Sequence, residues 1–376
     1  MTALPLRVAD VFRTHWPDYL RAHTVPAFQL KAASHLLACR TPALGGHVWR
    51  CAACGQRAVL LNSCRDRHCP TCQGEARAKW LARRMKEVIP VPYFHVVFTL
   101  PHELNPLIRY NREALIDLFF REVNATLQEF GHDPQWRLGG QLGFLAVLHT
   151  WTQTLLEHLH LHCAVPGGAW QSGAEIWVSA RRNWLFRETS LAARFRTRYL
   201  RAVVRLLDRE KLVLPALAED WKAVCSRLAQ TNWIVYAKKP FAGPQQVLEY
   251  LGRYTHKVAI SDYRIRALEN GQVTFRYRDR QAGDIEKNMT LETAEFIRRF
   301  LLHILPPGLQ KIRFFGWMAR NVRTDNLRRI RKALGVPRPT LQPPEKPVCP
   351  TCPLCGKAAL IRMGVIEQAR APPEPS

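Results

Sequence analysis

Three histidines stand at alternate positions in the segment "EHLHLHCAVPGG", residues 157–168: His158, His160 and His162. Alternation is the period of a β-strand, in which every second side chain points to the same face. Such a strand would present a row of imidazoles, and two neighbouring imidazoles can hold one divalent cation. The alternative interpretation is three polar side chains on a solvated sheet face.

The row lacks the partners that zinc-dependent hydrolases need. Hydrolases with a His-x-His pair also use an Asp-His or Glu-x-x-His motif nearby, and "HLHLHCAV" contains neither. The pattern therefore suits magnesium or manganese, which would position a phosphate and leave the nucleophilic attack to a side chain.

Two tyrosines could supply that nucleophile. Tyr250 and Tyr254 in "VLEYLGRYTHKV" are four residues apart, so they share one face of a helix. Because Val247 and Leu251 fall on the same stripe, core packing is the simpler interpretation of the pair taken alone. Three basic side chains occupy the same turns: Arg253, His256 and Lys257. These would be costly on a buried face but useful beside a phosphodiester, where a tyrosine hydroxyl can form a phosphotyrosine.

The chain has 11 cysteines, most of them in CxxC pairs, which favours metal ligands over disulfides. Their spacing predicts a structural zinc site, because four thiolates satisfy a tetrahedral ion and leave no open position for catalysis. The expected ligands are Cys51, Cys54, Cys69 and Cys72. Candidates for a second zinc site are Cys39, His47, Cys64 and His68. A possible tail site, which needs a fourth ligand from elsewhere or from another chain, has Cys349, Cys352 and Cys355.

Charge indicates the partner. The 376 residues include 55 Lys and Arg against 30 Asp and Glu, a formal charge of +25, which favours nucleic acid first and an anionic membrane second. No apolar run is long enough to span a bilayer, and the N-terminus lacks the layout of a secretion signal. We therefore expect no membrane partner and a cytoplasmic protein, associated with the bacterial nucleoid while it acts.

Long helical patterns alternate with separate strands, which predicts an α+β fold with helices packed on a mostly antiparallel sheet. Strands are expected at 93–100, 232–239 and 273–280 and at the end of 143–168. Helices are expected at 105–131, 190–212, 243–259, 291–305 and 321–335. Composition suggests three consecutive segments: a cysteine-rich module at 1–85, a mixed domain at 90–335, and a Pro-rich linker with a cysteine-containing tail at 336–376.

Five motifs in this order and spacing carry a family resemblance: "SCRDRHCPTCQ", "FTLPHELNPL", "HLHLHCAVPGG", "YAKKPFAGP" and "YLGRYTHKVAIS". Together they closely resemble the insertion-sequence-ninety-one family of transposases, rolling-circle enzymes of the HUH class (His-hydrophobe-His). The resemblance covers roughly residues 30 to 335. It implies a zinc-binding, DNA-contacting module followed by an HUH-endonuclease domain. It also implies that His160 and His162 are the metal pair and that Tyr250 and Tyr254 are the nucleophiles.

HUH enzymes complete the metal site with a third ligand, for which His158, His256, Glu157 and His95 are the candidates. A basic groove for single-stranded DNA is expected from Lys238, Lys239, Arg253, Lys257, Arg276 and Arg278, with Trp233 stacking on bases.

The implied function is a DNA transposase that nicks and joins single-stranded DNA through a 5′-phosphotyrosine intermediate. Its partners would be the single-stranded ends of its own mobile element and the target DNA. Its cofactors would be magnesium or manganese for nicking and zinc for structure. A plasmid replication initiator or a relaxase would share this chemistry. A non-enzymatic zinc-dependent DNA-binding protein would explain the charge and the cysteines, but not the histidine row or the paired tyrosines.

Overall fold

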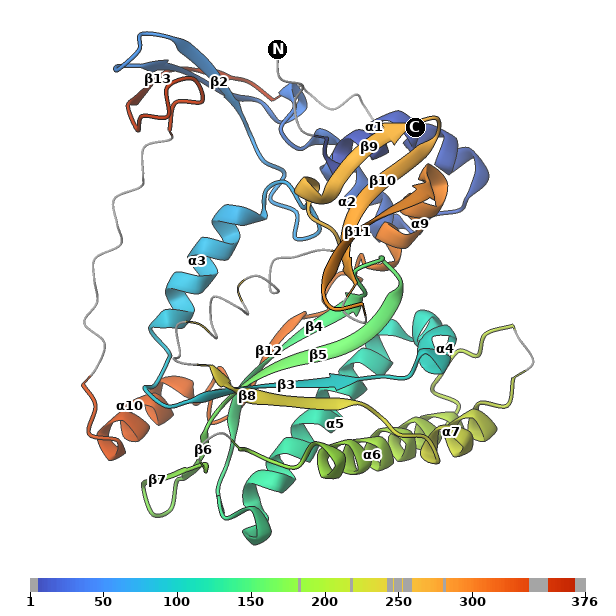
Figure 1. Cartoon of the computed structure of the whole chain (residues 1–376), viewed down its shortest axis with the longest axis vertical. Coiled ribbons are helices and arrows are strands. Elements are labelled where there is room, and N and C mark those ends of the chain that lie inside the picture. The colour runs from blue at the N-terminus through green and yellow to red at the C-terminus, as the bar shows by residue number, and fades with distance from the viewer. Residues whose placement is uncertain are drawn as a thin grey trace. The chain divides into compact units, whose positions relative to one another are not determined.

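A computed structural model gives the structure of the chain, which divides into two compact units (Figure 1). The residues described are 6–181, 184–216, 219–241, 246, 252, 259–279, 282–337 and 351–368. The cysteine unit comprises 1–76, 260–304 and 339–376, and the histidine unit comprises 77–259 and 305–338. This division differs from the three consecutive segments expected, because residues 260–304 and the tail belong with the N-terminal module. Composition along the chain does not reveal which segments distant in sequence fold into the same unit.

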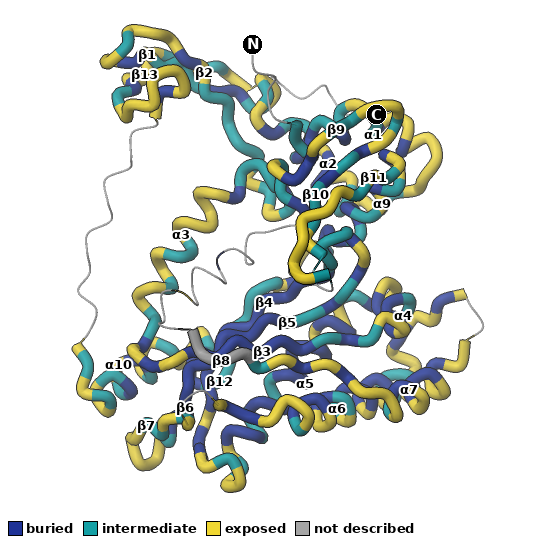
Figure 2. The backbone as a smooth tube through the Cα atoms, in the orientation of Figure 1, coloured by how far each residue is buried: buried dark blue, intermediate teal, exposed yellow. Residues whose placement is uncertain are grey.

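A five-stranded sheet is the centre of the histidine unit, in the order β12-β4-β5-β3-β8. Its strands are β12 (Ile312–Gly316), β4 (Gly143–Trp151), β5 (Glu157–Pro166), β3 (Tyr93–Thr99) and β8 (Val235–Phe241). Every neighbouring pair is antiparallel, which confirms the predicted sheet type. Strand β4 was not expected as a separate element. Figure 2 shows these central strands as largely buried.

Helices cover one face of this sheet. They are α4 (Asn105–Tyr110), α5 (Arg112–His132), α6 (Glu188–Asp208) and α7 (Trp221–Ala229). Their apolar stripes meet alternate residues of β3, β4 and β5 in the main hydrophobic core. The single helix predicted at 105–131 is broken at Asn111, whose side-chain amide donates to the carbonyls of Leu107 and Val213.

The opposite face of the sheet has an apolar part and a histidine part. Tyr93, Leu145, Val147 and Ala164 pack in a second core with Trp317 and residues of α10 (Arg323–Ala333). A small hairpin of β6 (Gly168–Gln171) and β7 (Ile176–Ser179) lies in the same unit, and α3 (Gln73–Met85) contains the division between the units.

Within its described residues, the cysteine unit contains three complete helices and two antiparallel sheets. The helices are α1 (Val8–Ala22), α2 (Ala27–Ala38) and α9 (Thr293–Leu302). One sheet has the order β11-β10-β9 (Ile285–Glu292, Gln272–Asp279, Ile265–Glu269). The other has the order β13-β1-β2 (Leu360–Ile366, Gly46–Cys51, Arg57–Leu61). Single 3₁₀ turns in the chain lie at Pro42–Leu44, His102–Leu104, Pro134–Trp136 and Asp262–Arg264.

None of the helices in the described part of the chain combines the length and the apolar character needed to cross a membrane.

Candidate functional site

The β4–β5 hairpin brings three histidines together on one face of the central sheet. His149 lies directly opposite His160, and Val147 lies opposite His162. Because residues opposite each other and residues two apart share a face, His149, His160 and His162 point to the same side. One ring nitrogen from each lies within 4.8 Å of the others, close enough for one metal ion. We call these three residues the histidine trio.

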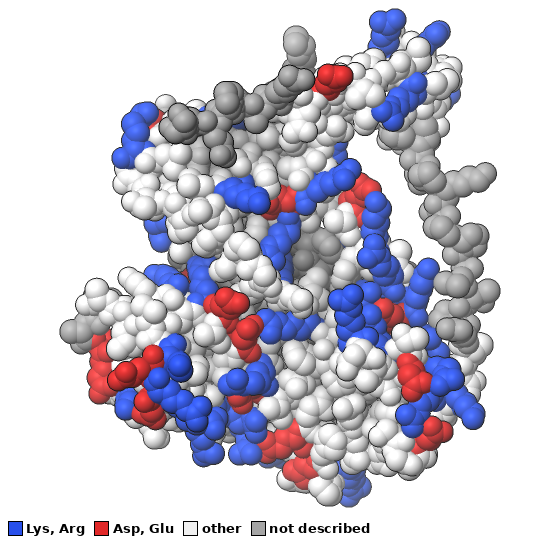
Figure 3. All heavy atoms as spheres, turned by 180° about the vertical axis from the view of Figure 1, so that it is seen from behind, with Lys and Arg blue, Asp and Glu red and all other residues white. Residues whose placement is uncertain are grey.

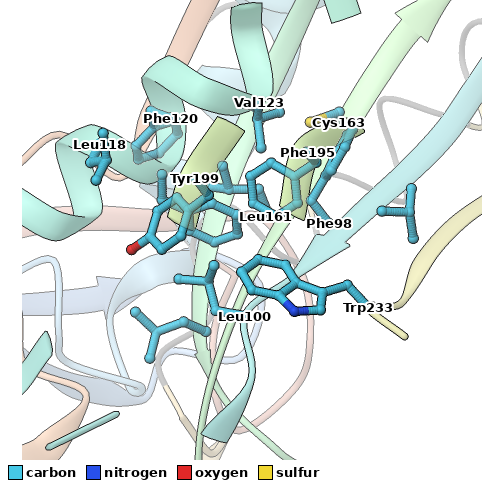
Figure 4. Packing of buried hydrophobic residues seen from close by; sticks show 14 of the residues in the cluster. Phe98, Leu100, Leu118, Phe120, Val123, Leu161, Cys163, Phe195, Tyr199 and Trp233 are labelled. Carbon is cyan, nitrogen blue, oxygen red and sulfur yellow. The ribbon is translucent and has the colours of Figure 1, made fainter. Parts of the chain in front are cut away.

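Packing on the opposite face holds this register. Leu148, Leu161 and Phe98 alternate with the histidines and are buried under the helices. Figure 4 shows Leu161 and Phe98 among Phe195 and Tyr199 of α6. A slip of one residue would turn this apolar row outward and the histidines inward, so hydrophobic burial fixes the side on which the histidines stand.

Hydrogen bonds orient two of the three rings. The Nδ1 atom of His160 is 2.9 Å from the backbone carbonyl of His158, so this nitrogen donates and Nε2 keeps the lone pair that binds a metal. The Nδ1 atom of His162 is 2.8 Å from Nε2 of His95 on β3. For His162 to bind a cation through Nε2, its Nδ1 must carry the proton and donate to His95. The His149 ring stacks on Trp151, with centroids 4.5 Å apart.

The other candidates for a third ligand have different surroundings. His158 is not in the trio, and its ring packs 5.0 Å from that of His102. Burial, reinforced by the charge of His102, lowers the pKa of His158 to about 4, so it is neutral near pH 7. Glu157 accepts hydrogen bonds from Arg109 and Arg112. His256 lies outside the described residues.

His149 is the site residue that sequence reasoning missed. It stands in "GFLAVLHTW", which was not separated from the strand that follows. The polar turn "TWTQT" between two apolar runs was the available signal, because a hairpin there would place residue 149 beside the histidine row.

The expected nucleophiles and much of the expected DNA groove lie outside the description. Tyr250, Tyr254, Arg253 and Lys257 are not among the described residues, and the side chains of Lys238 and Lys239 are not described. Most of the helix predicted at 243–259 also falls there.

Two other groove residues are described and belong to the cysteine unit. Arg276 on β10 pairs with Glu286 at 3.3 Å, and Arg278 pairs with Asp284 at 3.0 Å. Lys and Arg are widespread on the face shown in Figure 3, more so than Asp and Glu.

Trp233 was expected to stack on bases, and this was wrong. Its side chain is buried in the main core against Phe195 and Tyr199, and its indole N–H donates to the carbonyl of Leu228 (Figure 4).

Among the cysteines that the structure describes, eight form two clusters, neither with the expected membership. The first contains Cys39, Cys64, Cys69 and Cys72. The second contains Cys51, Cys54, Cys352 and Cys355. Cys51 ends β1, so it lies at the tip of the β1–β2 hairpin, whereas Cys39 and Cys64 flank its base. Strand β1 spans about 17 Å. Because Cys51 and Cys54 lie at one end of the hairpin and Cys69 and Cys72 follow its other end, these four cysteines do not share one site.

The two histidines proposed for a second zinc site are not in either cluster. His68 and His35 both contact the carboxylate of Asp66, at 3.2 and 2.7 Å. Burial opposes ionisation of Asp66, but these two hydrogen bonds outweigh it and lower the pKa of that carboxyl. His47 lies in β1, and its ring forms an edge-to-face pair with that of Trp49, with centroids 6.2 Å apart. Cys349 lies outside the described residues.

Comparison with known proteins decides the family. Residues 143–326 match a family model described as "Putative transposase", and residues 11–100 match one described as "Transposase zinc-binding domain". A protein of Sinorhizobium fredii named "Putative transposase y4qJ" is 40% identical over 386 residues, which cover 97% of this chain and 97% of that protein. The chain belongs to the insertion-sequence-ninety-one family of transposases.

A second relative of this transposase is named "Transposase for insertion sequence element IS801", from Pseudomonas savastanoi pv. phaseolicola. It is 28% identical over 346 residues, which cover 90% of this chain and 82% of that protein. No solved structure matches the chain. The transposase acts on DNA, and its zinc-binding domain contains the whole of the first cysteine cluster.

Proposed function

We propose that this transposase nicks and rejoins single-stranded DNA by HUH chemistry, with the histidine trio holding the catalytic cation. The observation that carries the proposal is the convergence of His149, His160 and His162 on one sheet face, with ring nitrogens within 4.8 Å. The donor set fits a divalent cation, since three imidazoles leave further coordination positions for phosphate oxygens and water. A bound magnesium or manganese ion would polarise the scissile phosphate.

The protein residues around the trio have positioning roles. The carbonyl of His158 and the ring of His95 hold His160 and His162 in orientation. His149 is 98% buried and His162 is 93% buried, whereas His160 is partly exposed, so DNA would approach from the side of His160. Trp151 stacks on His149, and the ammonium of Lys311 lies 5.1 Å from the Trp151 ring centroid. These two side chains are candidates for contacts with a base and a phosphate beside the site.

The nucleophile in this proposal is Tyr250 or Tyr254, on the basis of the family motif. The phenol oxygen attacks phosphorus, and the bond from phosphorus to the 3′-oxygen breaks. The 5′-phosphate stays on the tyrosine, and the departing oxygen takes a proton to become a free 3′-hydroxyl. The second tyrosine would accept the other strand end, so rejoining needs no free double-strand break.

Covalent capture of DNA tests this function. The full chain is incubated with labelled single-stranded DNA from the ends of its own element, with manganese or with EDTA, and resolved on a denaturing gel. We expect a manganese-dependent protein–DNA adduct that is lost in Tyr250→Phe plus Tyr254→Phe and in His160→Ala. Adducts that persist in the double tyrosine variant would refute the assigned nucleophiles.

Matched controls are present in the same unit. Tyr110→Phe changes an exposed tyrosine of α4, and His132→Ala changes a histidine at the exposed end of α5. Both should leave the adduct unchanged. If no oligonucleotide from either end gives an adduct although the protein binds DNA and keeps its zinc, the protein is a DNA-binding protein without nicking activity. A replication initiator or relaxase would give the same adduct, and transposition of a marked element in cells separates those outcomes.

A further inference from the structure

We propose that the second cysteine cluster, Cys51, Cys54, Cys352 and Cys355, is a zinc site that ties the C-terminal tail to the N-terminal module. The zinc-binding domain match ends at residue 100, so it includes only half of these ligands. Their sulfur atoms lie within 4.8 Å of one another, and all four are in the cysteine unit.

The sulfur spacing agrees with tetrahedral zinc. The Sγ atoms of Cys51 and Cys355 are 3.7 Å apart, and those of Cys54 and Cys352 are 3.8 Å apart. Zinc–sulfur bonds of about 2.3 Å place neighbouring sulfurs of a tetrahedron about 3.8 Å apart. Disulfide sulfurs would be about 2.05 Å apart, and all four cysteines are free.

The two CxxC segments have the same backbone geometry, although they come from opposite ends of the chain. Gly55 N–H donates to the carbonyl of Cys51 at 2.8 Å, and Gly356 N–H donates to the carbonyl of Cys352 at 2.8 Å. The two glycines have φ of 71° and 73°, a conformation that side chains rarely adopt. Each segment therefore forms a knuckle that can present two thiolates, as a zinc ribbon requires.

The knuckles continue into a shared sheet. Strand β13 pairs with β1 along its whole length, from Gly46 opposite Ile366 to Cys51 opposite Leu360. Ala52 N–H also donates to the carbonyl of Ala359 at 2.8 Å. The tail thus supplies both a third strand and the missing pair of ligands.

Packing alone gives this region little stability. Its buried cluster consists of Cys51, Cys352 and Leu360, and most of β13 is exposed. Modules with so small a core rely on a metal or a disulfide to fold. We therefore infer that zinc at these four thiolates holds the tail in place.

Metal content tests the proposal on the full chain. We expect two zinc ions per chain by elemental analysis, and one in the double variant Cys352→Ser plus Cys355→Ser. Cys349→Ser is the matched control, because the four ligands are complete without it, and it should keep both ions. A wild-type chain with one zinc, or a double variant that keeps two, would overturn the proposal.

A second variant covers the possibility that the double variant misfolds. Cys355→His keeps a metal ligand, so it should retain two metals. After cobalt substitution it should show the spectrum of one S₄ site and one S₃N site. Two unchanged S₄ spectra would exclude Cys355 as a ligand. Limited proteolysis should cut residues 338–376 faster in the double serine variant than in wild type, and equal rates would mean that metal does not hold the tail.

Discussion

The histidine trio and the second cysteine cluster are both groups of side chains that could hold a metal ion, but the chain builds them in opposite ways. The trio comes from one hairpin, and its register is fixed by a hydrophobic core on the other side of the same sheet. In the second cysteine cluster, Cys51 and Cys355 are 304 positions apart. In the described part of the chain the buried hydrophobic residues there are Cys51, Cys352 and Leu360, of which the first two are themselves candidate ligands. The difference supports the proposal that packing positions the trio before a cation binds, whereas zinc assembles the second cysteine cluster.

The largest effect should follow from removing a trio ligand. We expect His162→Ala to reduce manganese-dependent nicking by more than about 10³-fold. Loss of a ligand to the cation should cost more rate than loss of a single hydrogen-bond donor to the transition state. Zinc content should not change, because both cysteine clusters found among the described residues lie in the cysteine unit, whereas His162 lies in the histidine unit. Nicking rates and elemental analysis on the same preparation check both statements. A variant that lost zinc together with nicking would contradict the independence of the two sites.

His95 should have a smaller effect, because it acts through His162. We expect His95→Ala to raise the manganese concentration for half-maximal nicking by about 10- to 100-fold, the usual cost of losing a partner that orients a metal ligand. His95→Gln should recover part of the loss, because the glutamine side-chain oxygen can accept a hydrogen bond from the Nδ1–H of His162. A change in maximal rate at saturating manganese, with the midpoint unchanged, would argue against this role.

Stability should separate the two regions. Leu161 is fully buried beneath the trio, so Leu161→Ala should destabilise the histidine unit by about 2–5 kcal/mol. It should leave zinc content unchanged. Chelation of zinc should have the opposite effect: it should lower the stability of the cysteine unit, while the central sheet of the histidine unit stays folded. Urea unfolding, with hydrogen exchange as the readout for each unit, measures both effects. If the two units unfold in a single shared transition in both experiments, they are not independent.

The smallest effect is expected at the paired arginines of β10. The Arg278–Asp284 ion pair is exposed, so Arg278→Gln should change stability by less than about 1 kcal/mol. If Arg278 also touches a phosphate, the variant should lower the salt dependence of DNA binding by about one counterion. Titrations at several salt concentrations measure this slope, and an unchanged slope would remove Arg278 from the proposed groove.

The sequence by itself indicated the class of fold and the residue types that could form the sites. Alternating histidines, apolar strands and paired cysteines predicted an antiparallel sheet, a metal-binding row and zinc ligands, because these patterns are local and repeat with the period of the backbone. The family motifs identified the same transposase family that the comparisons show. His160 and His162 were therefore candidates for a metal site from the sequence alone.

Tertiary structure alone decided which residues join these patterns. His149 meets His160 only through hairpin register, and Cys51 meets Cys355 only because β13 returns to β1. Trp233 is polar enough at its indole N–H to contact DNA, yet packing buries it. CxxC spacing predicts how many ligands each knuckle offers, but it does not predict which other knuckle lies beside it in the fold. Partners across a sheet depend on pairing between distant segments, and that pairing is set by burial of the whole core.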